Sequence, residues 1–309
     1  MRIVFLGSGA FGVPALEALV RERHDVLAVI TQPDREKGRG RLLAAPPSKT
    51  AALALQLPVL QPARIRDAAA VSALRALEPQ VLVVVAYGQI LPREAIALAP
   101  AGAVNVHASL LPRYRGAAPI QWAIARGEQE TGVTTMLLDE GLDTGPLLLA
   151  ARTRIDPEET AGVLETRLAQ VGAALLIETL ARLGHGQLTP LPQDESLALH
   201  APRLRKEDGR IDWRWRAAEI ACRVRGFNPW PCAHTLLGSR LIKILRARIG
   251  DDTTAPPGEI LLSGRSGLSV ACGDGRTLEV VELQPENRRA MEASVFLAGA
   301  RLAQGQRFE

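Results

Sequence analysis

The chain has 309 residues, 47% hydrophobic and 23% charged, a globular composition that excludes a disordered or fibrous protein. Its length allows two domains, each with its own core. Its three cysteines form no CxxC pair, which excludes a disulfide framework and a cysteine zinc site, so we expect free thiols and no bound metal. The apolar start is too short for a secretory signal, and no long uncharged apolar run follows. We therefore expect a cytoplasmic protein without a membrane partner.

The net charge of +4 is unevenly distributed along the chain. The segment Arg203–Arg248 carries twelve Lys and Arg residues against four Asp and Glu residues. A basic segment of this kind suits a polyphosphate partner such as a nucleic acid, because each neutralised phosphate releases counterions. A solvated basic face is the alternative that charge alone leaves open.

The chain begins with an apolar run, Arg2–Leu6, a glycine-rich turn at residues 7–12 and a helical pattern over Val13–Val20. The turn reads G-x-G-x-x-G between a strand and a helix, which is typical of dinucleotide binding. An NAD-dependent oxidoreductase is therefore an alternative from another functional class. The next predicted strand, Asp25–Ile30, ends in Thr31-Gln32, where an NAD site carries an acidic residue. A tight strand-to-helix turn is the interpretation that we prefer.

A basic loop is predicted over Pro33–Lys49. Its glycines alternate with basic residues, so the charges should reach outward from the surface. On composition alone, an ordinary surface loop is an equal alternative. Its five basic residues are Arg35, Lys37, Arg39, Arg41 and Lys49.

Helices and strands then alternate, which predicts an α/β fold with a Rossmann-like, open and mostly parallel sheet. The predicted helices are Ser48–Leu57, Asp67–Leu77, Pro92–Leu98, Ile120–Ala125 and Thr160–Leu183. The predicted strands after the basic loop are Val59–Leu60, Val81–Ala86, Ala103–His107, Gly132–Leu138 and Leu147–Ile155.

The strand Ala103–His107 carries the first candidate site residues. Apolar and polar residues alternate along it, so Asn105 and His107 should share one face. Turn-forming residues from Ser109 to Gly116 end the strand. An open α/β sheet builds its sites from side chains at the ends of strands beside such loops.

A second segment, Gly141-Leu-Asp143-Thr-Gly145, places a carboxylate between two glycines, which allow sharp turns and close approach. An amide, an imidazole and a carboxylate suit acyl transfer to a substrate that brings its own amine. Asn105 would bind an oxyanion, His107 would move a proton, and Asp143 would orient His107. The alternative is that all three are ordinary polar residues of a strand end and a turn.

The last third of the chain changes character. Gly184–Glu207 is rich in turn residues and predicts a linker. The short alternating runs Leu241–Leu245, Glu259–Leu262, Leu268–Ala271 and Leu278–Leu283 predict a small β-barrel. We therefore predict one domain over residues 1–188, a linker over 189–207 and a second domain over 208–309. We interpret the tryptophans between Trp213 and Trp230 as packing residues.

The motifs around these residues closely resemble the signature of the folate-dependent formyltransferases. They are the run from Asn105-Val-His107-Ala-Ser109 to Arg115-Gly116-Ala-Ala-Pro119, then Glu130-Thr-Gly132, and then Asp139-Glu-Gly141-Leu-Asp143-Thr-Gly145. Three more segments are similar to the members that act on methionyl initiator tRNA, namely Thr31-Gln-Pro33-Asp34-Arg35, Gly38-Arg39-Gly40-Arg41 and Phe227-Asn-Pro229-Trp-Pro231. The resemblance covers nearly the whole chain. One departure is Ser8-Gly9-Ala10, where the family usually has a Thr-Pro-acidic run.

The resemblance implies a fold, an activity and a set of site residues. It implies an OB-like second domain, 10-formyltetrahydrofolate as co-substrate and methionyl initiator tRNA as acceptor. It makes Asn105, His107 and Asp143 catalytic. It places Tyr87, Gly88, Ser109, Leu110, Leu111 and Pro112 at the folate pocket, and Arg35, Lys37, Arg39 and Arg41 in a loop that enters the acceptor stem. We expect a monomer. A formyltransferase for an amino sugar nucleotide, a formate-releasing hydrolase and an RNA-binding module remain as rivals.

Overall fold

Two neighbouring valine-rich strands form the centre of the fold, because strands of this composition are buried on both faces. In the computed structural model they are β6 (Val81–Val85) and β7 (Ala103–His107), all of whose residues are buried.

The structure describes every residue except 38–41, 264–266, 301 and 303–304. Its internal contacts divide the chain into two units. The first comprises residues 1–119, 130–154 and 165–201, and the second comprises residues 120–129, 155–164 and 202–309.

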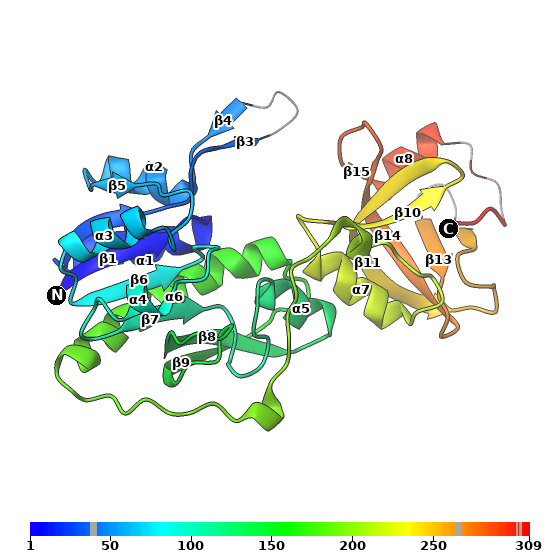
Figure 1. Ribbon diagram of the computed structural model, residues 1–309. Coiled ribbons are helices and arrows are strands. Elements are labelled where there is room, and N and C mark those ends of the chain that lie inside the picture. The colour runs from blue at the N-terminus through cyan, green and yellow to red at the C-terminus, as the bar shows by residue number, and fades with distance from the viewer. Residues whose placement is uncertain (38–41, 264–266, 301, 303–304) are drawn as a thin grey trace. The chain divides into compact units, whose positions relative to one another are not determined.

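A seven-stranded sheet in the order β5-β2-β1-β6-β7-β8-β9 builds the first unit (Figure 1). The strands from β5 to β7 run parallel, whereas β8 and β9 run antiparallel to their neighbours. The prediction of an open, mostly parallel α/β sheet is confirmed. The other strands are β1 (Arg2–Gly7), β2 (Asp25–Ile30), β5 (Val59–Leu60), β8 (Glu130–Leu137) and β9 (Leu147–Arg154).

Helices cover both faces of this sheet. Leu74 of α3 and Ala95 of α4 share a buried cluster with Leu82 of β6, whereas Gly172 of α6 packs on the opposite face against Val106 of β7. Each predicted helix before residue 185 is present within a few residues of its predicted ends. They are α1 (Val13–Arg21), α2 (Pro47–Ala54), α3 (Ala68–Ala76), α4 (Arg93–Ile96), α5 (Pro119–Ala125) and α6 (Ala161–Gly184), with a 3-10 turn, η1 (Ala10–Gly12), before α1.

The prediction of a plain loop over Pro33–Lys49 is wrong in part. Two strands of three residues, β3 (Arg35–Lys37) and β4 (Leu42–Ala44), pair antiparallel and form a ribbon. Strands this short show no usable side-chain period, so the backbone pairing that creates them leaves no sequence signal. We call residues 35–44 the basic ribbon.

An ion pair anchors the base of the basic ribbon. The ammonium of Lys49 donates to both carboxylate oxygens of Asp34, at 2.9 and 2.8 Å, and Gln61 Nε2 donates to Asp34 Oδ1 at 2.8 Å. These hydrogen bonds, first from Lys49 and then from Gln61, lower the pKa of the Asp34 carboxyl. Lys49 is therefore engaged within the fold and is no part of the outward-facing charge.

An antiparallel sheet in the order β10-β11-β14-β13-β12, with β15 paired to β14, builds the second unit. Its strands are β10 (Ala233–Leu237), β11 (Arg240–Asp252), β12 (Ile260–Ser263), β13 (Gly267–Ala271), β14 (Arg276–Pro285) and β15 (Met291–Glu292). The 3-10 turns η2 (Glu195–Leu197), which belongs to the first unit, and η3 (Lys206–Gly209) precede them, and the helices are α7 (Ala217–Gly226) and α8 (Ala293–Gly299). The predicted β-rich second fold is confirmed. We predicted neither β10 nor α7. In α7, arginines separate the apolar positions.

The chain's last residues bridge the two edge strands of this sheet. Glu309 exchanges two backbone hydrogen bonds with Leu236 of β10. The carbonyl of Gln306 accepts from the amide of Ile260 in β12, and the amide of Phe308 donates to Gly258. The backbone between the edges of an open sheet is thereby satisfied, as it is in a barrel. The gap between β10 and β12 is closed by a tail and not by direct strand pairing.

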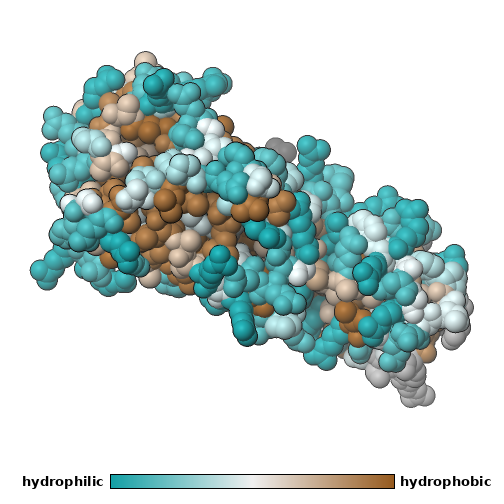
Figure 2. Space-filling view, turned by 90° about the horizontal axis from the view of Figure 1, so that it is seen from below, coloured by the Kyte–Doolittle hydropathy of each residue, from teal (hydrophilic) through white to brown (hydrophobic). Residues whose placement is uncertain are grey.

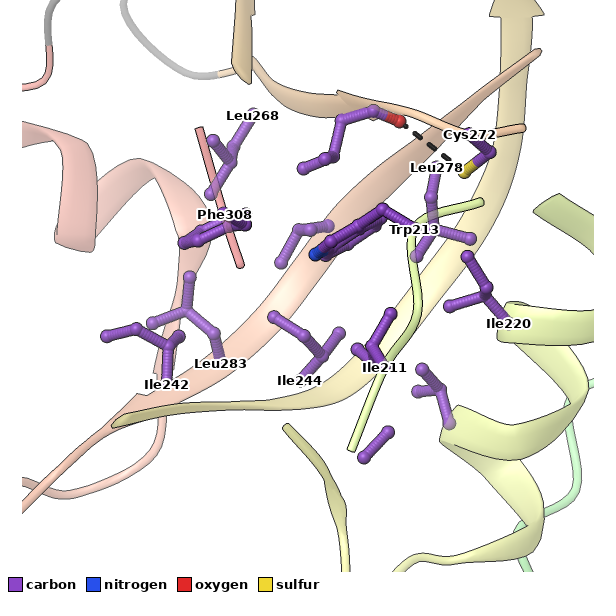
Figure 3. Packing of buried hydrophobic residues seen from close by; sticks show 14 of the residues in the cluster. Ile211, Trp213, Ile220, Ile242, Ile244, Leu268, Cys272, Leu278, Leu283 and Phe308 are labelled. Carbon is purple, nitrogen blue, oxygen red and sulfur yellow. Dashed lines mark hydrogen bonds between the residues drawn. The ribbon is translucent and has the colours of Figure 1, made fainter. Parts of the chain in front are cut away.

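Trp213 is the centre of the second unit's core (Figure 3). Its indole stacks on the ring of Phe308 with a centroid separation of 5.8 Å and an interplanar angle of 14°. Its Nε1 donates to Thr235 Oγ1 at 3.0 Å, and that hydroxyl donates to the Glu309 carbonyl at 2.7 Å. The interpretation of Trp213 as a packing residue is confirmed, whereas the side chain of Trp230 is 51% exposed.

The surfaces of the two units differ. Figure 2 shows that hydrophobic side chains gather on one face of the first unit, while hydrophilic side chains dominate the second unit in the same view.

The three cysteines are free thiols, and burial raises the pKa of the Cys272 thiol to about 12. Among the helices of the described residues, none is long and apolar enough to cross a membrane.

Replacing Phe308 by alanine should lower the free energy of unfolding by about 3–5 kcal/mol, because it leaves a cavity beside Trp213. Thermal and urea unfolding, followed by tryptophan fluorescence, measure this loss. Val295→Ala, on an exposed face of α8, is the matched control and should change the free energy by less than about 0.5 kcal/mol. Equal stability of the two variants would contradict a stabilising role for the tail.

Candidate active site

Asn105 and His107 leave one face of β7, which lies between β6 and β8 in the sheet. Asn105 lies beside Val84 and Met136, and His107 lies beside Thr134. Only 9% of Asn105 and 6% of His107 is exposed. Two polar side chains buried to this extent need hydrogen-bonding partners, and a loop supplies them.

The loop after β8 brings Asp143 to these side chains. The amide of Leu138 donates to Ala103 at the start of β7, so the loop has to fold back along the strand. Asp143 has a φ of +56°. Its Oδ1 lies 3.5 Å from Asn105 Nδ2, and its Oδ2 lies 3.6 Å from His107 Nδ1. The structure therefore brings the three predicted catalytic side chains together.

Two glycines permit this approach. The amide of Gly116 donates to Asp143 Oδ2 at 2.8 Å, and Gly116 has a φ of +117° with the position of a Cβ only 2.7 Å from the Ala201 carbonyl. At Gly145 a Cβ would lie 1.8 Å from the Leu137 carbonyl. A side chain at either position would displace the backbone that holds the carboxylate.

His107 is held on both sides of its ring. Its Nε2 lies 2.9 Å from the Tyr114 carbonyl, which can only accept, so Nε2 carries the hydrogen. Its Nδ1 lies 3.6 Å from Asp143 Oδ2, a distance that is long for a hydrogen bond. A ring that carries a second proton on Nδ1 would find an oxygen partner at each nitrogen.

The turn after β7 is held internally. Ser109 is completely buried, and its hydroxyl donates to the Arg113 carbonyl at 2.6 Å. The hydroxyl of Thr134 donates to the Ser109 carbonyl and accepts from the Leu111 amide. Ser109 and Leu111, two residues of the predicted folate pocket, are thus fixed in place, while Leu110 and Pro112 are partly exposed.

Sequence reasoning missed two residues beside this site. Gln193 and Glu195 lie in the segment predicted as a linker, yet their side chains meet the buried guanidinium of Arg115. No local pattern marks them, because the contact joins positions about 80 residues apart. Arg115, within the motif, was the available signal, since a buried arginine needs an acceptor.

A shallow cleft of about 460 Å³ opens beside the Asp143 loop. Its volume is that of a small-molecule site, in the usual range of about 300–1,000 Å³. Its lining residues are Arg93, Ile96, Asp139, Glu140 and Gly141. Within the described part of the chain, no group of three His, Cys, Asp or Glu side chains is placed to hold a metal ion.

Comparison with known families matches both parts of the chain. Residues 1–180 match the formyl transferase family model, and residues 203–301 match the model of the formyl transferase C-terminal domain. This chain belongs to the formyl transferase family.

Its curated relatives are similar over their whole length. A methionyl-tRNA formyltransferase of Pelobacter propionicus is 51% identical over 303 residues, covering 98% of this chain and 94% of the relative. A protein of the same name from Geobacter sulfurreducens is 47% identical, covering 99% and 96%. One from Anaeromyxobacter dehalogenans is 51% identical, covering 97% of each.

Solved structures confirm the fold. The N-formyltransferase of Helicobacter canadensis, solved with folinic acid and dTDP-3-aminofucose, has a TM-score of 0.69 at 17% identity and covers 90% of this chain and 98% of its own. The sugar 3N-formyltransferase WlaRD has a TM-score of 0.69 at 18% identity and covers 94% and 99%. At such identities the likeness concerns the fold alone.

Within this formyl transferase, the predicted folate residues Tyr87 and Gly88 differ in exposure. The ring of Tyr87 is buried in the core, its hydroxyl has no hydrogen-bond partner among the described residues, and burial raises its pKa to about 12. Its carbonyl accepts from Gln32 Nε2 at 2.9 Å. Gly88 is exposed, with a φ of +81°. At these two residues, only backbone atoms are available to line a folate pocket.

Ser8, where this chain departs from the family pattern, ties three segments together. Its hydroxyl donates to the Tyr87 carbonyl at 3.2 Å and accepts from the Gln32 amide at 2.9 Å. The amides of Ser8 and Gly9 both donate to the Ala86 carbonyl. Backbone amides that would bind a pyrophosphate in a dinucleotide site are therefore already engaged, so the glycine-rich run is a packed turn.

Two of the four residues predicted to contact tRNA lie in the described part of the basic ribbon. Arg35 is exposed on β3, and Lys37 is the last residue of that strand. Arg39 and Arg41 lie outside the described residues. Residues 31–34 connect β2 to the ribbon (Figure 1).

Removal of the Tyr87 hydroxyl tests whether that group contributes to the site. Tyr87→Phe should retain the KM for folate and raise the free energy of unfolding by about 1 kcal/mol, because a buried hydroxyl without a partner is lost. Tyr87→Ala should instead lower that free energy by about 3–5 kcal/mol. Steady-state kinetics and thermal unfolding check both variants. A clear rise in KM for Tyr87→Phe would place the hydroxyl at the folate.

Proposed function

We propose that this chain transfers a formyl group from 10-formyltetrahydrofolate to the α-amino group of methionine esterified to initiator tRNA. The observation that carries the proposal is the placement of Asn105 and His107 against Asp143 in a chain that is 51% identical to a methionyl-tRNA formyltransferase. These side chains suit acyl transfer to an amine, a reaction that needs no side-chain nucleophile.

The proposed roles follow from the contacts at each atom. When the amine attacks the formyl carbon, negative charge develops on the formyl oxygen, and Asn105 Nδ2 donates to it. His107, held between the Tyr114 carbonyl and the Asp143 carboxylate, donates to the same charge. The C–N10 bond then breaks as His107 delivers a proton to N10, and the imidazole takes up the proton that the amine loses. Protons and electrons therefore balance without a further reactant.

The folate is proposed to lie against the turn after β7 and the cleft beside the Asp143 loop. Leu110 and Pro112 are partly exposed there, and Gly88 offers a backbone without a side chain. Arg93 lines the cleft and its guanidinium lies 3.5 Å from Glu140 in an exposed pair. Such a pair can open, so Arg93 is free to exchange Glu140 for a carboxylate of the folate tail.

The tRNA is proposed to be held by the basic residues. Arg35, Lys37, Arg39 and Arg41 bring four positive charges to one short segment, and the second unit is rich in arginine. Arginine suits phosphates and base edges alike because its fork of donors matches both. We further propose that the enzyme is monomeric and works in the cytoplasm. We also propose that its two domains, residues 1–188 and 208–309, are connected through residues 189–207.

A formylation assay with several acceptors tests the function. Methionyl initiator tRNA, methionyl elongator tRNA, an amino sugar nucleotide and no acceptor are compared with 10-formyltetrahydrofolate as donor. Selective formylation of the initiator is the expected result. Activity only on the sugar nucleotide, or formate release without acceptor, would overturn the acceptor while keeping the chemistry.

Asn105→Ala should lower kcat by about 100- to 1,000-fold, since one oxyanion donor is worth about 3 kcal/mol. The KM for tRNA should remain within about twofold, because Asn105 lies at the chemistry and not on the basic ribbon. Single-turnover formylation measures the chemical step directly. Near-normal turnover would remove Asn105 from the proposed mechanism.

Loss of a positive charge on the basic ribbon should weaken the binding of tRNA but not that of folate. Arg39→Ala should raise the KM for tRNA, leave the KM for folate unchanged, and reduce the slope of log(kcat/KM) against log[salt] by about one. Arg75→Ala, an exposed arginine of α3, is the control and should change neither. An equal loss with a small methionine ester as acceptor would argue against a tRNA role.

A further inference from the structure

The segment after α6 is bound along the first unit. Leu191 exchanges two backbone hydrogen bonds with Leu147 at the start of β9, at 2.8 and 2.9 Å. Further on, the amide of Arg115 donates to Leu199 and the amide of Ala201 donates to Arg115, at 2.8 and 2.7 Å. We call residues 191–201 the strap, because it joins the strand after the Asp143 loop to the turn after β7.

The strap carries the acceptors for a buried cation. Arg115 is only 3% exposed, and its guanidinium forms a two-pronged pair with the Glu195 carboxylate, at 2.8 and 2.7 Å. Its Nε and Nη2 both donate to Gln193 Oε1, at 3.0 and 2.8 Å. The hydrogen bonds from Arg115 lower the pKa of the Glu195 carboxyl. Arginine is suited to this place because its rigid fork can satisfy both acceptors at once.

Gln193 connects this cation to the catalytic loop. Its Nε2 donates to the carbonyls of Asp143 and Gly145, at 2.9 and 2.7 Å. Arg115 fixes the oxygen of the same carboxamide, so the amide nitrogen has to point at the loop. Arg115 and Gln193 thus hold the backbone on one side of Asp143, while Gly116 holds its carboxylate on the other.

We propose that Gln193, oriented by Arg115 and Glu195, is a positioning residue that sets the Asp143 carboxylate against His107 and Asn105. The inference rests on the proposed function for its kinetic readout. Asp143 has a left-handed backbone, which an aspartate adopts less readily than a glycine does. The two hydrogen bonds from Gln193 to the Asp143 and Gly145 carbonyls hold the loop in this conformation. The strap is therefore part of the active site and not merely a connection.

Two substitutions at Gln193 separate its two contacts. Gln193→Leu removes both. Gln193→Glu keeps an oxygen for Arg115 but has no N–H to donate to Asp143 and Gly145. If Gln193 acts through the loop, both variants should lose about 10- to 100-fold in kcat at unchanged KM for folate and tRNA, as a small displacement of a catalytic group does. If it only satisfies Arg115, Gln193→Glu should be near wild type, which would overturn the proposal.

A double-mutant cycle and a control complete the kinetic test. In an Asp143→Asn background, Gln193→Glu should cause less than about a twofold further loss, because the group that it positions is already gone. Additive losses would overturn the proposal. Gln187→Leu, an exposed glutamine between α6 and the strap, is the matched control and should be unchanged. Thermal unfolding of each variant identifies any general loss of the fold.

Hydrogen exchange gives a readout without substrate. The Gly116 amide donates to Asp143 Oδ2, so its exchange rate reports whether the carboxylate is in place. Gln193→Glu should speed this exchange by tenfold or more, with the amides of β6 unchanged, and an unchanged Gly116 rate would overturn the proposal. If the wild type formylated no acceptor, the proposed function would fail alone, while the exchange measurement would still decide the inference.

Discussion

The site depends on one carboxylate that is held from two directions. Asp143 Oδ2 accepts from the Gly116 amide at 2.8 Å, and its backbone carbonyl accepts from Gln193 at 2.9 Å. Between these anchors the carboxylate faces His107 and Asn105, which are too deeply buried to find water as an easy substitute. A carboxylate in such a place fixes the orientation of the imidazole. The other contacts of the site keep these groups in their relative positions.

Strand direction explains why the Asp143 loop needs so much support. Because β8 runs antiparallel to β7, its end at Leu137 lies beside the beginning of β7 and far from His107. The loop must therefore return along the sheet, and it passes so close to β8 that Gly145 has no room for a Cβ. A loop that returns in this way has no regular pairing of its own. The strap supplies the missing hydrogen bonds at Asp143 and Gly145.

Two other parts of the first unit are held by small polar clusters. The basic ribbon consists of two three-residue strands, and it is attached to the sheet through Asp34, Lys49 and Gln61. These hydrogen bonds fix the base of the ribbon to the sheet. Ser8 acts similarly, because its hydroxyl joins the segments that follow β1, β2 and β6 through Gln32 and Tyr87. These small polar clusters hold loops that have little apolar area to bury.

The sequence by itself determined the α/β fold class, the position of most helices and strands before residue 185, and the candidate residues Asn105, His107 and Asp143. These follow from side-chain period and from motifs whose residues are close together in the chain. Only the tertiary structure decided that Lys49 is used to anchor the ribbon, that the Tyr87 ring lies in the core, that residues 306–309 close the second sheet, and that Gln193 and Glu195 belong to the site. Each of these depends on hydrogen bonds or packing between residues far apart in sequence. Such contacts leave no local pattern, because their partners are chosen only when the chain has folded.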